Sequence, residues 1–289
     1  MNIAFVGATS YVAQDLIERF LQTDCKLFLF ARNPQNIFWL NDKITFGTLN
    51  DFKNYEYDVI INCIQTVFID YEKYDNMIIE YLLKHVDSLY IHFSSGAVYG
   101  KNFNKPVTKK TISSIKINDI KEIDYYYINK IYTEAKHRSF ANLNIIDIRL
   151  FSYFSKYVYL KIYQHYFMNN IVRCLINKTI FKTNSINFIR DFVHPADLFD
   201  LIIKCIDIKK LNTFFDVYSI KPTSKFEILS LCEKEFYLQY EFINTIDTEN
   251  KTGEKNVMYS TNYKAKEIGY TPNYSSLEAI KDQLQKIFT

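Results

Sequence analysis

Apolar positions in the first half of the chain form short runs that alternate with amphipathic stretches. Runs typical of buried strands occupy residues 2–7, 26–31, 58–63, 88–93 and 143–150. Between them, apolar residues recur at helical spacing over residues 11–21, 75–84 and 128–142. Strands that alternate with helices indicate βαβ units with parallel strands. The pattern predicts an α/β protein with a Rossmann-like, doubly wound parallel sheet.

The pattern loosens after residue 150. Helices are expected over residues 158–177, 196–208, 225–236 and 276–288, with short strands between them, and the polar residues 101–124 predict a loop. We expect residues 1–155 to form the main α/β domain. Residues 156–289 are expected to form mainly a smaller lobe, with some segments returning to the first domain.

The first strand runs directly into the turn Gly7-Ala-Thr-Ser-Tyr-Val-Ala13 and then a helix. A glycine turn between a strand and a helix N-terminus is typical of a pyrophosphate site. Ser10 and Ala13 stand where such turns often have their second and third glycines, and we hypothesise that the Ser10 hydroxyl donates to a phosphate. The alternative is a plain strand–turn–helix. A P-loop is not indicated, since no Gly-Lys-Ser/Thr follows. The predicted dinucleotide contacts are Gly7, Thr9, Ser10, Tyr11 and Val12.

The end of the second predicted strand bears on which dinucleotide binds. Arg32 stands where NAD-preferring proteins usually carry an acidic residue for the ribose 2′-hydroxyl. A guanidinium there suits a 2′-phosphate. We therefore predict that NADP(H) is the preferred cofactor and NAD(H) a possible one, while an ordinary solvent-facing arginine is the alternative.

A candidate catalytic trio follows from spacing. Tyr126 and Lys130 lie four residues apart, on one face of a predicted helix, and neither neighbouring tyrosine has a lysine at this spacing. A nearby ammonium stabilises a tyrosinate and lowers the pKa of the phenol. Ser95 follows a predicted strand, whose carboxyl end should face the cofactor crevice. Together the three groups suit proton transfer at a carbonyl or alcohol oxygen during hydride transfer.

Composition excludes several other classes of protein. The net charge is only +3 over 289 residues, and no basic tract interleaved with aromatics suggests nucleic acid. The five cysteines are odd in number and far apart, so neither a disulfide framework nor a zinc site is expected. No signal-like N-terminus or membrane-length apolar run is present. We expect a cytoplasmic protein with no membrane partner.

Several segments resemble the motifs of extended short-chain dehydrogenases/reductases, the NAD-dependent epimerase/dehydratase family. They are Ser94-Ser-Gly-Ala-Val-Tyr-Gly100, Tyr126-Tyr-Ile-Asn-Lys130 with Glu134, Arg190-Asp-Phe-Val-His-Pro-Ala-Asp197, Lys264-Ala-Lys-Glu-Ile-Gly-Tyr-Thr-Pro272, and residues 47–51 followed by 57–63. The resemblance covers almost the whole chain in the right order. It implies NAD(P) in the first domain, a nucleotide sugar in the C-terminal lobe, and a homodimer.

The resemblance also assigns roles by position. Ser95 matches the catalytic Ser/Thr, Tyr126 the acid/base and Lys130 its helper. Arg190 matches the residue that binds the substrate diphosphate. The remaining contacts implied are Thr48 and Leu49 at the adenine, where the family often has Asp, and Gly96 and Ser152 at the substrate, with Ser152 replacing a usual Asn.

Three further polar residues of these motifs are expected to have a structural rather than a catalytic role. These are Glu134, His194 and Asp197, of which Asp197 is expected to cap the following helix.

The residues after Ser95 narrow the reaction that the resemblance implies. Similar 4,6-dehydratases carry Asp-Glu there, and fucose-synthase-like enzymes carry Cys at the first position; this chain has Gly96 and Ala97. A 4-ketoreductase or a 4-epimerase remains. Arg32 and the short chain favour an NADPH-dependent ketoreductase of a deoxysugar nucleotide for surface polysaccharide. The alternatives are an epimerase with tightly bound NAD and a non-catalytic NADP(H) sensor.

Overall fold

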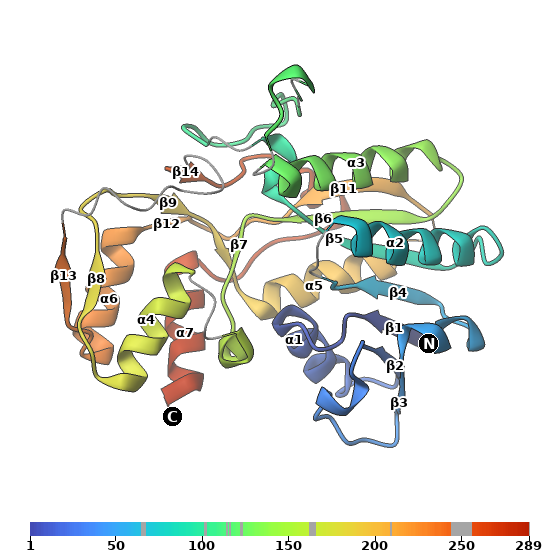
Figure 1. The fold of residues 1–289 in the computed structure, drawn as a ribbon, viewed down its shortest axis with the longest axis horizontal. Helices are drawn as coiled ribbons and strands as arrows, with labels where there is room; N and C mark the ends of the chain where they lie inside the picture. Colours follow the sequence, from blue (N-terminus) through green and yellow to red (C-terminus); the bar gives the residue numbers. More distant parts are fainter. Residues whose placement is uncertain are drawn as a thin grey trace.

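The computed structural model describes residues 1–64, 68–100, 103–113, 115, 117–121, 124–161, 166–208, 210–243 and 256–288. Its centre is a parallel seven-stranded sheet in the order β11-β6-β5-β4-β1-β2-β3 (Figure 1). The strands are β1 (Asn2–Val6), β2 (Lys26–Phe30), β3 (Ile44–Gly47), β4 (Val59–Asn62), β5 (Leu89–Ser95), β6 (Ile145–Leu150) and β11 (Asn212–Asp216). The chain order reverses between β1 and β4. A crevice outside the carboxyl ends of these strands is the usual ligand site of such a sheet.

Helices cover both faces of the sheet (Figure 1). One face carries α1 (Tyr11–Phe20) and α5 (Pro195–Ile206), which share one apolar core with the sheet. The other carries α2 (Phe68–Leu82) and α3 (Tyr125–Ser139). Burial on both sides explains why β1, β2 and β4 show continuous apolar runs rather than alternation.

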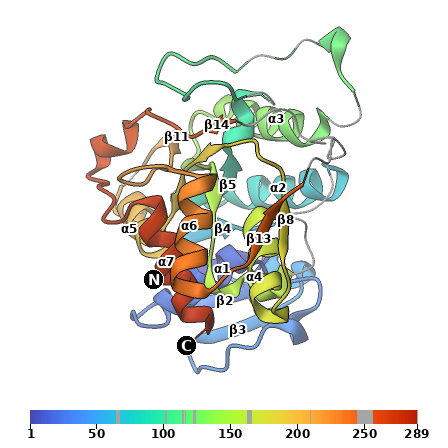
Figure 2. The same ribbon diagram turned by 90° about the vertical axis from the view of Figure 1, so that its left-hand side faces the viewer.

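The C-terminal lobe packs its own apolar core between three helices (Figure 2). These are α4 (Phe167–Asn177), α6 (Lys225–Phe236) and α7 (Ser276–Phe288). Small sheets border them: β7 (Ser152–Tyr153) with β10 (Phe192–Val193); β8 (Phe181–Thr183) with β13 (Tyr240–Phe242); and β9 (Ile189–Arg190) with β12 (Thr223–Ser224) and β14 (Val257–Met258). The 3₁₀ turns are η1 (Pro34–Asn36), η2 (Leu49–Asn54), η3 (Gly96–Tyr99), η4 (Ile117–Asp119), η6 (Lys156–Lys161) and η7 (Lys264–Ile268).

The elements agree with the sequence pattern except at five places. Helix α3 spans Tyr125–Ser139 rather than residues 128–142. Helix α2 begins at Phe68 rather than at residue 75, and η6 and α4 occupy most of the single helix expected over residues 158–177. Strands β3 and β11 were not predicted individually. Both are edge strands with partly exposed residues, so their apolar signal is weak. Among the described residues, no helix is long and apolar enough to cross a membrane.

Candidate active site

The turn after β1 brings the backbone of α1 close to the end of β4. Gly7 has φ +84°, and a Cβ there would lie 2.8 Å from the Ile64 nitrogen, so only glycine fits. Ser10 caps α1 by accepting a hydrogen bond from the Ala13 nitrogen at 3.2 Å. The helix thus begins at the topological switch point, with its positive end at the crevice.

The other residues predicted around this turn differ in what they expose. Thr9 is exposed, and Tyr11 stacks on Tyr153 with ring centroids 5.7 Å apart. Val12 is buried in the core, only 4% exposed. Its side chain is therefore not accessible to a ligand.

A cavity of about 550 Å³ lies beyond the ends of β2 and β3. Its lining residues are Arg32, Thr48, Leu49, Asn50, Lys53, Lys73, Tyr74, Met77 and Glu80. The structure thus brings together the three residues predicted for the adenosine end, and adds Lys73 from α2. The Thr48 hydroxyl donates to Asp51 at 2.7 Å, which shapes the turn and lowers the pKa of that carboxyl.

The predicted catalytic trio meets where β5 ends and α3 begins. Ser95 is the last residue of β5 and is 8% exposed. Tyr126 lies in the first turn of α3, and the Ser95 side chain lies close enough to its hydroxyl to lower the pKa of the phenol. Lys130, one turn on, donates from Nζ to the Phe93 carbonyl at 3.0 Å and lies 4.8 Å from the Tyr71 ring centroid.

Burial sets the proton affinities of this trio. It lowers the pKa of Lys130 to about 8, against the attraction of Glu134, Asp147 and Asp75. The Tyr126 side chain is half exposed (52%), yet the protein atoms around its hydroxyl raise the pKa of the phenol, outweighing the opposite effect of Ser95. At neutral pH the tyrosine therefore holds a proton to donate, beside a protonated lysine.

Arg190, the predicted diphosphate ligand, has an unusual environment. Its Nη1 contacts the Met258 sulfur at 3.6 Å, and its guanidinium lies 4.8 Å from the Phe188 ring centroid. Its Nε is buried with no hydrogen-bond partner in the described part of the chain. Burial lowers the pKa of this arginine. A half-buried cation whose buried Nε is unsatisfied suits an anionic ligand.

The other two predicted substrate contacts have visible packing roles. A Cβ on Gly96 would lie 2.5 Å from the Phe151 ring, so this glycine lets the turn pack on that ring. Ser152 opens β7 and pairs with Phe192 of β10. Both lie close along the chain to the trio or to Arg149, but no described contact ties either to a ligand site.

The three polar residues expected to be structural all make internal contacts, with one correction. Glu134 accepts from Arg149 Nε at 3.0 Å. His194, not Asp197, caps α5, accepting from the Ala196 nitrogen at 3.0 Å. Asp197 instead accepts from the Asn273 nitrogen at 2.9 Å, because the C-terminal segment packs over the first turn of α5.

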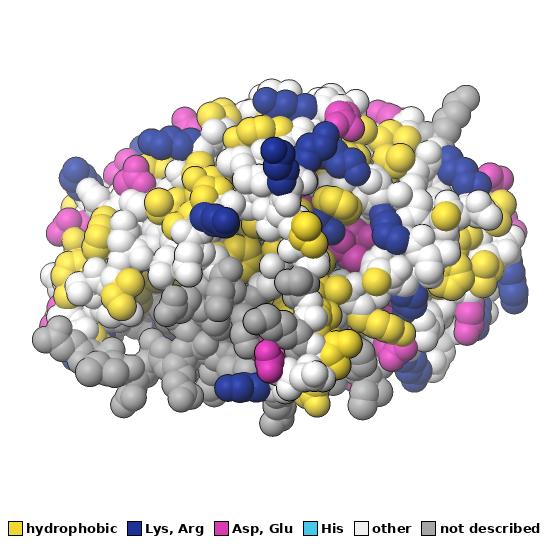
Figure 3. Space-filling view, turned by 90° about the horizontal axis from the view of Figure 1, so that it is seen from above, with side chains coloured by type: hydrophobic (Ala, Val, Ile, Leu, Met, Phe, Trp, Pro, Cys, Tyr) yellow, Lys and Arg dark blue, Asp and Glu magenta, His cyan; other side chains and the backbone are white. Residues whose placement is uncertain are grey.

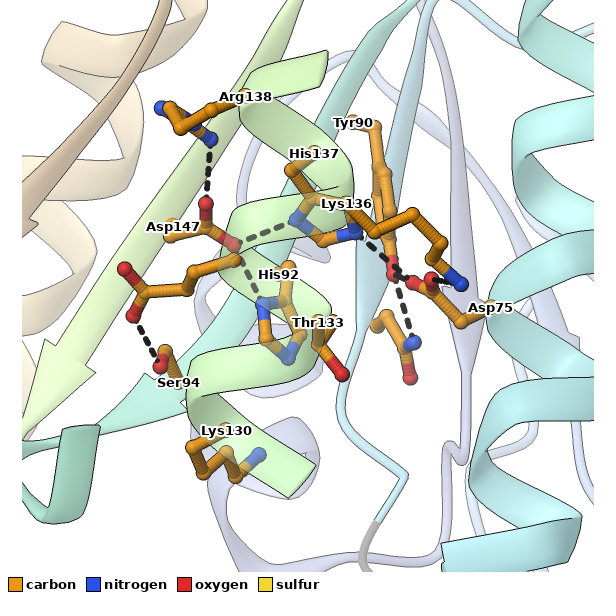
Figure 4. Close-up of polar contacts among 12 residues, drawn as sticks. Asp75, Tyr90, His92, Ser94, Lys130, Thr133, Lys136, His137, Arg138 and Asp147 are labelled. Carbon is orange, nitrogen blue, oxygen red and sulfur yellow. Dashed lines mark hydrogen bonds and ion pairs between the residues drawn. The ribbon is translucent and has the colours of Figure 1, made fainter. Parts of the chain in front are cut away.

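A buried cluster beneath α3 was missed by the sequence reasoning. Asp147 of β6 lies between His92 of β5 and His137 of α3, and His137 also contacts Asp75 of α2 (Figure 4). One signal existed: His137 follows Lys130 by seven residues, on the same helix face. The strand residues His92 and Asp147 show no local sequence signal, because their partners are distant in sequence.

The described residues fit a dinucleotide. The Gly7 turn has no room for a side chain, α1 begins at the crevice, and a cationic cavity follows at the ends of β2 and β3. The trio lies at the end of β5, where a nicotinamide ring would approach. A fold and site of this kind are typical of dinucleotide-dependent enzymes.

Comparison with known proteins identifies the family. The model of the NAD dependent epimerase/dehydratase family matches residues 3–217, and the chain belongs to this family. The predictions of the family, the Rossmann-like fold and a short-chain dehydrogenase/reductase enzyme are confirmed. No curated protein matches.

Solved structures are similar in fold at low identity. The dTDP-glucose 4,6-dehydratase of Bacillus anthracis, in complex with NAD, is 15% identical with TM-score 0.79, covering 99% of this chain and 96% of that one. The UDP-glucuronic acid 4-epimerase of Bacillus cereus, in complex with UDP-glucuronic acid and NAD, is 16% identical with TM-score 0.76, covering 100% and 99%. The UDP-glucose 4-epimerase of Thermotoga maritima, with UDP-glucose, is 16% identical with TM-score 0.79, covering 100% and 98%.

Proposed function

We propose that the enzyme is an NADPH-dependent 4-ketoreductase of a nucleotide-activated deoxysugar, acting in surface polysaccharide biosynthesis. The observation that carries this proposal is the meeting of Ser95, Tyr126 and Lys130 at the end of β5, with no acidic side chain directly after the serine. Such a site has one proton donor beside the expected nicotinamide position.

The proposed chemistry follows from the three side chains. The bound dinucleotide supplies the hydride for the C4 carbonyl carbon. Ser95 donates a hydrogen bond to the carbonyl oxygen, and Tyr126 transfers its phenolic proton to that oxygen as the alcohol forms. Lys130 stabilises the tyrosinate left behind, which then takes a proton from solvent.

The segment after Ser95 supports hydride chemistry over dehydration. Eliminating water across C5–C6 needs an acid and a base beside the sugar ring, and the corresponding residues here are Gly96 and Ala97. Both are buried, and Gly96 packs on the Phe151 ring. The similarity to a 4,6-dehydratase therefore supports a common fold rather than a common reaction.

A nucleotide diphosphate is supported by the environment of Arg190. Its guanidinium has an orphan donor, and a diphosphate offers acceptor oxygens and the compensating charge. Two of the similar structures contain UDP-sugars. We infer that Arg190 binds the diphosphate of the substrate here.

The preference for NADP(H) is supported by the cavity at the ends of β2 and β3. Arg32, Lys53 and Lys73 line it, and Lys53 is partly neutralised by Glu80 at 3.1 Å. Cations suit a 2′-phosphate. Two of the similar structures hold NAD, so NAD(H) stays the alternative.

The experiment that tests the reductase is a turnover assay with a panel of 4-keto nucleotide sugars and NADPH, together with mass spectrometry of any cofactor retained on purification. We expect NADPH oxidation that Tyr126→Phe reduces by 10²-fold or more, on the order of general acid catalysis. Tyr125→Phe, a neighbouring exposed tyrosine, is the matched control and should keep activity.

The other outcomes of this assay identify the alternatives. Tightly retained NAD, with interconversion of C4 epimers and no NADPH oxidation, would identify the 4-epimerase instead. Cofactor binding without turnover of any sugar would favour the sensor.

We also propose that the protein forms a homodimer through α2 and α3. These helices pack side by side on one face of the sheet (Figure 1). The side chains of Tyr125 and Tyr132 on α3 are exposed. Sedimentation equilibrium tests this directly, and a monomer at micromolar concentration would contradict it.

On the face in Figure 3, lysines and acidic side chains are interspersed, which fits a small-molecule rather than a nucleic-acid partner.

A further inference from the structure

The buried face of α3 is polar where a helix packed on a sheet normally presents apolar side chains. Lys130, Thr133, Glu134 and His137 are all buried and recur at helical spacing. The helix that carries the proposed catalytic pair is thus held on the sheet largely by hydrogen bonds and charges. Directional contacts fix the register of a helix more closely than apolar ones do.

The strands beneath α3 match this polar stripe. In β5, Leu89, Ile91 and Phe93 belong to the apolar core on the α1 side, so the alternate residues point toward α3. Among these is His92, which lies beside Asp147 of β6 in the strand register. Polar residues therefore alternate with apolar ones on strands whose two faces are both covered.

Asp147 is the centre of the cluster. Its Oδ1 accepts from His92 Nδ1 at 2.5 Å and from His137 Nδ1 at 2.8 Å, and its Oδ2 accepts from Arg138 (Figure 4). His137 Nε2 contacts Asp75 Oδ1 at 3.1 Å. One carboxylate thereby joins β6 to β5 and, through two consecutive residues, to α3.

The protonation states of the cluster follow from its partners. Burial lowers the pKa of His137, but Asp147 and Asp75 outweigh it and raise the pKa to about 9. Burial lowers the pKa of His92 to about 4. Burial raises the pKa of Asp147, but both histidines outweigh it and hold this pKa far below its usual range. At neutral pH the cluster holds a His137–Asp147 ion pair and a neutral His92.

The cluster adjoins the lysine of the proposed catalytic trio. Lys130 donates to the carbonyl of Phe93, the residue after His92. The charged groups that act on it are Glu134 on α3, Asp147 on β6 and Asp75 on α2. Lys136, His137, Arg138 and Arg149 are the cations that share these carboxylates. The uncharged polar groups that face Lys130 or Asp147 are Tyr71 and His92, and Tyr126 in turn acts on Tyr71.

We propose that Asp147 is a positioning residue for Lys130. Through His92 and His137 it fixes the register of α3 on β5 and β6, and its negative charge, together with that of Glu134, raises the proton affinity of the buried ammonium. This inference rests on the proposed catalytic role of Lys130. By this proposal Asp147, a strand residue outside the reaction crevice, influences the proton affinity of Lys130.

A metal ion is the competing interpretation of two histidines and a carboxylate, and the contacts argue against it. The ligand atoms of a tetrahedral zinc site lie roughly 3.3 Å apart, given bonds of about 2.0–2.1 Å. Asp147 Oδ1 is closer than that to both histidine nitrogens, at 2.5 and 2.8 Å. These are hydrogen-bond distances, and the adjoining cations Lys136 and Arg138 would repel a metal.

The test is the titration of Lys130 by the ¹³Cε NMR shift of labelled lysine, assigned through the Lys130→Met variant. Asp147→Asn should lower the pKa of Lys130 by about one pH unit, because an opposite charge is lost. His137→Gln should raise it by a similar amount, because Asp147 then acts without its buried counterion. Asp197→Asn, an equally buried carboxylate on α5, should leave it unchanged.

Opposite shifts in the two cluster variants support the proposal. No shift in either variant, or an equal shift in Asp197→Asn, overturns it, as does a stoichiometric metal in the purified protein. If Asp147→Asn does not fold, His137→Gln decides alone. Long-range ¹H–¹⁵N spectra of the five histidines should show His137 doubly protonated and His92 neutral at pH 7.

Turnover separates this inference from the proposed function. If the reductase exists, the alkaline limb of kcat/KM should move in each variant in the same direction as the pKa of Lys130. If the lysine titrations shift as expected but Tyr126→Phe does not affect turnover, the proposed function fails and the role of Asp147 toward Lys130 stands. If Tyr126→Phe abolishes turnover and the titrations do not shift, the reverse holds.

Discussion

Arg190→Met is predicted to weaken ligand binding without lowering the stability of the free protein. The guanidinium lies against Phe188 and Met258, and its Nε has no hydrogen-bond partner among the described residues. Burial of the charge lowers the pKa of this arginine, so its environment is unfavourable until an anion arrives. Met is unbranched and keeps much of the apolar packing of the side-chain stem.

The expected changes in stability and affinity follow from two hydrogen-bond energies: the cost of the unsatisfied Nε donor, and the gain when it binds an anion. An unsatisfied buried donor costs about 1–3 kcal/mol, so removing it should leave the free energy of unfolding equal or slightly higher. A hydrogen bond to a charged group contributes about 1.5–3 kcal/mol, which corresponds to about a 10- to 150-fold loss of affinity for a nucleoside diphosphate.

The assay is thermal unfolding with and without UDP or dTDP, with affinities from calorimetry. Arg173→Met is the matched control, because Arg173 lies on α4 in the same lobe and already donates to Asn170 at 2.6 Å. The reasoning is refuted if Arg190→Met lowers the melting temperature of the free protein while nucleotide affinity stays as in the wild type.

Three further predictions follow from other parts of the structure. Arg32→Ala should weaken NADPH binding about tenfold or more while NADH binding is unaffected, as measured by fluorescence titration; equal losses for both would exclude a 2′-phosphate contact. Gly96→Ala should lower the free energy of unfolding by about 1–3 kcal/mol in urea, because its Cβ would overlap the Phe151 ring, and an unchanged midpoint would contradict this. His137 has a folded-state pKa of about 9, above the unfolded value, so its stabilising contribution is complete below about pH 6.5 and is lost as the pH rises through 9. The stability difference between wild type and His137→Gln should therefore shrink by up to about 3 kcal/mol between pH 6.5 and 9.5; a constant difference would show that the histidine is neutral.

Local features explain why much of the fold was predictable. Helix α6 begins at Lys225 as expected, since Ser224 and Glu227 form a capping box within four residues. The Gly7 turn and the Tyr126–Lys130 spacing are equally local, and the structure brings both to the carboxyl edge of the sheet. Strands β3 and β11 escaped prediction because short edge strands bury too little to leave a clear pattern.

Contacts between distant segments were beyond the sequence. Asp197 was expected to cap a helix because it stands in the first turn of α5. Its carboxylate instead accepts hydrogen bonds from the backbone nitrogens of Asn273 and Tyr274, in the C-terminal segment. Arg190 Nε lacks a hydrogen-bond partner among the described residues because Phe188 and Met258 pack around the guanidinium. The sequence motif that contains Arg190 does not reveal these neighbours.

The sequence by itself determined the alternation of strands and helices, the Gly7 turn and the candidate trio, because each is recognised from short local motifs. Only the tertiary structure decided how that trio is held. His92, Asp147 and His137 come from two strands and a helix, and their polarity is understandable only once those elements pack together. A buried charge is stable only beside its partners, and the fold, not the local sequence, brings those partners into contact.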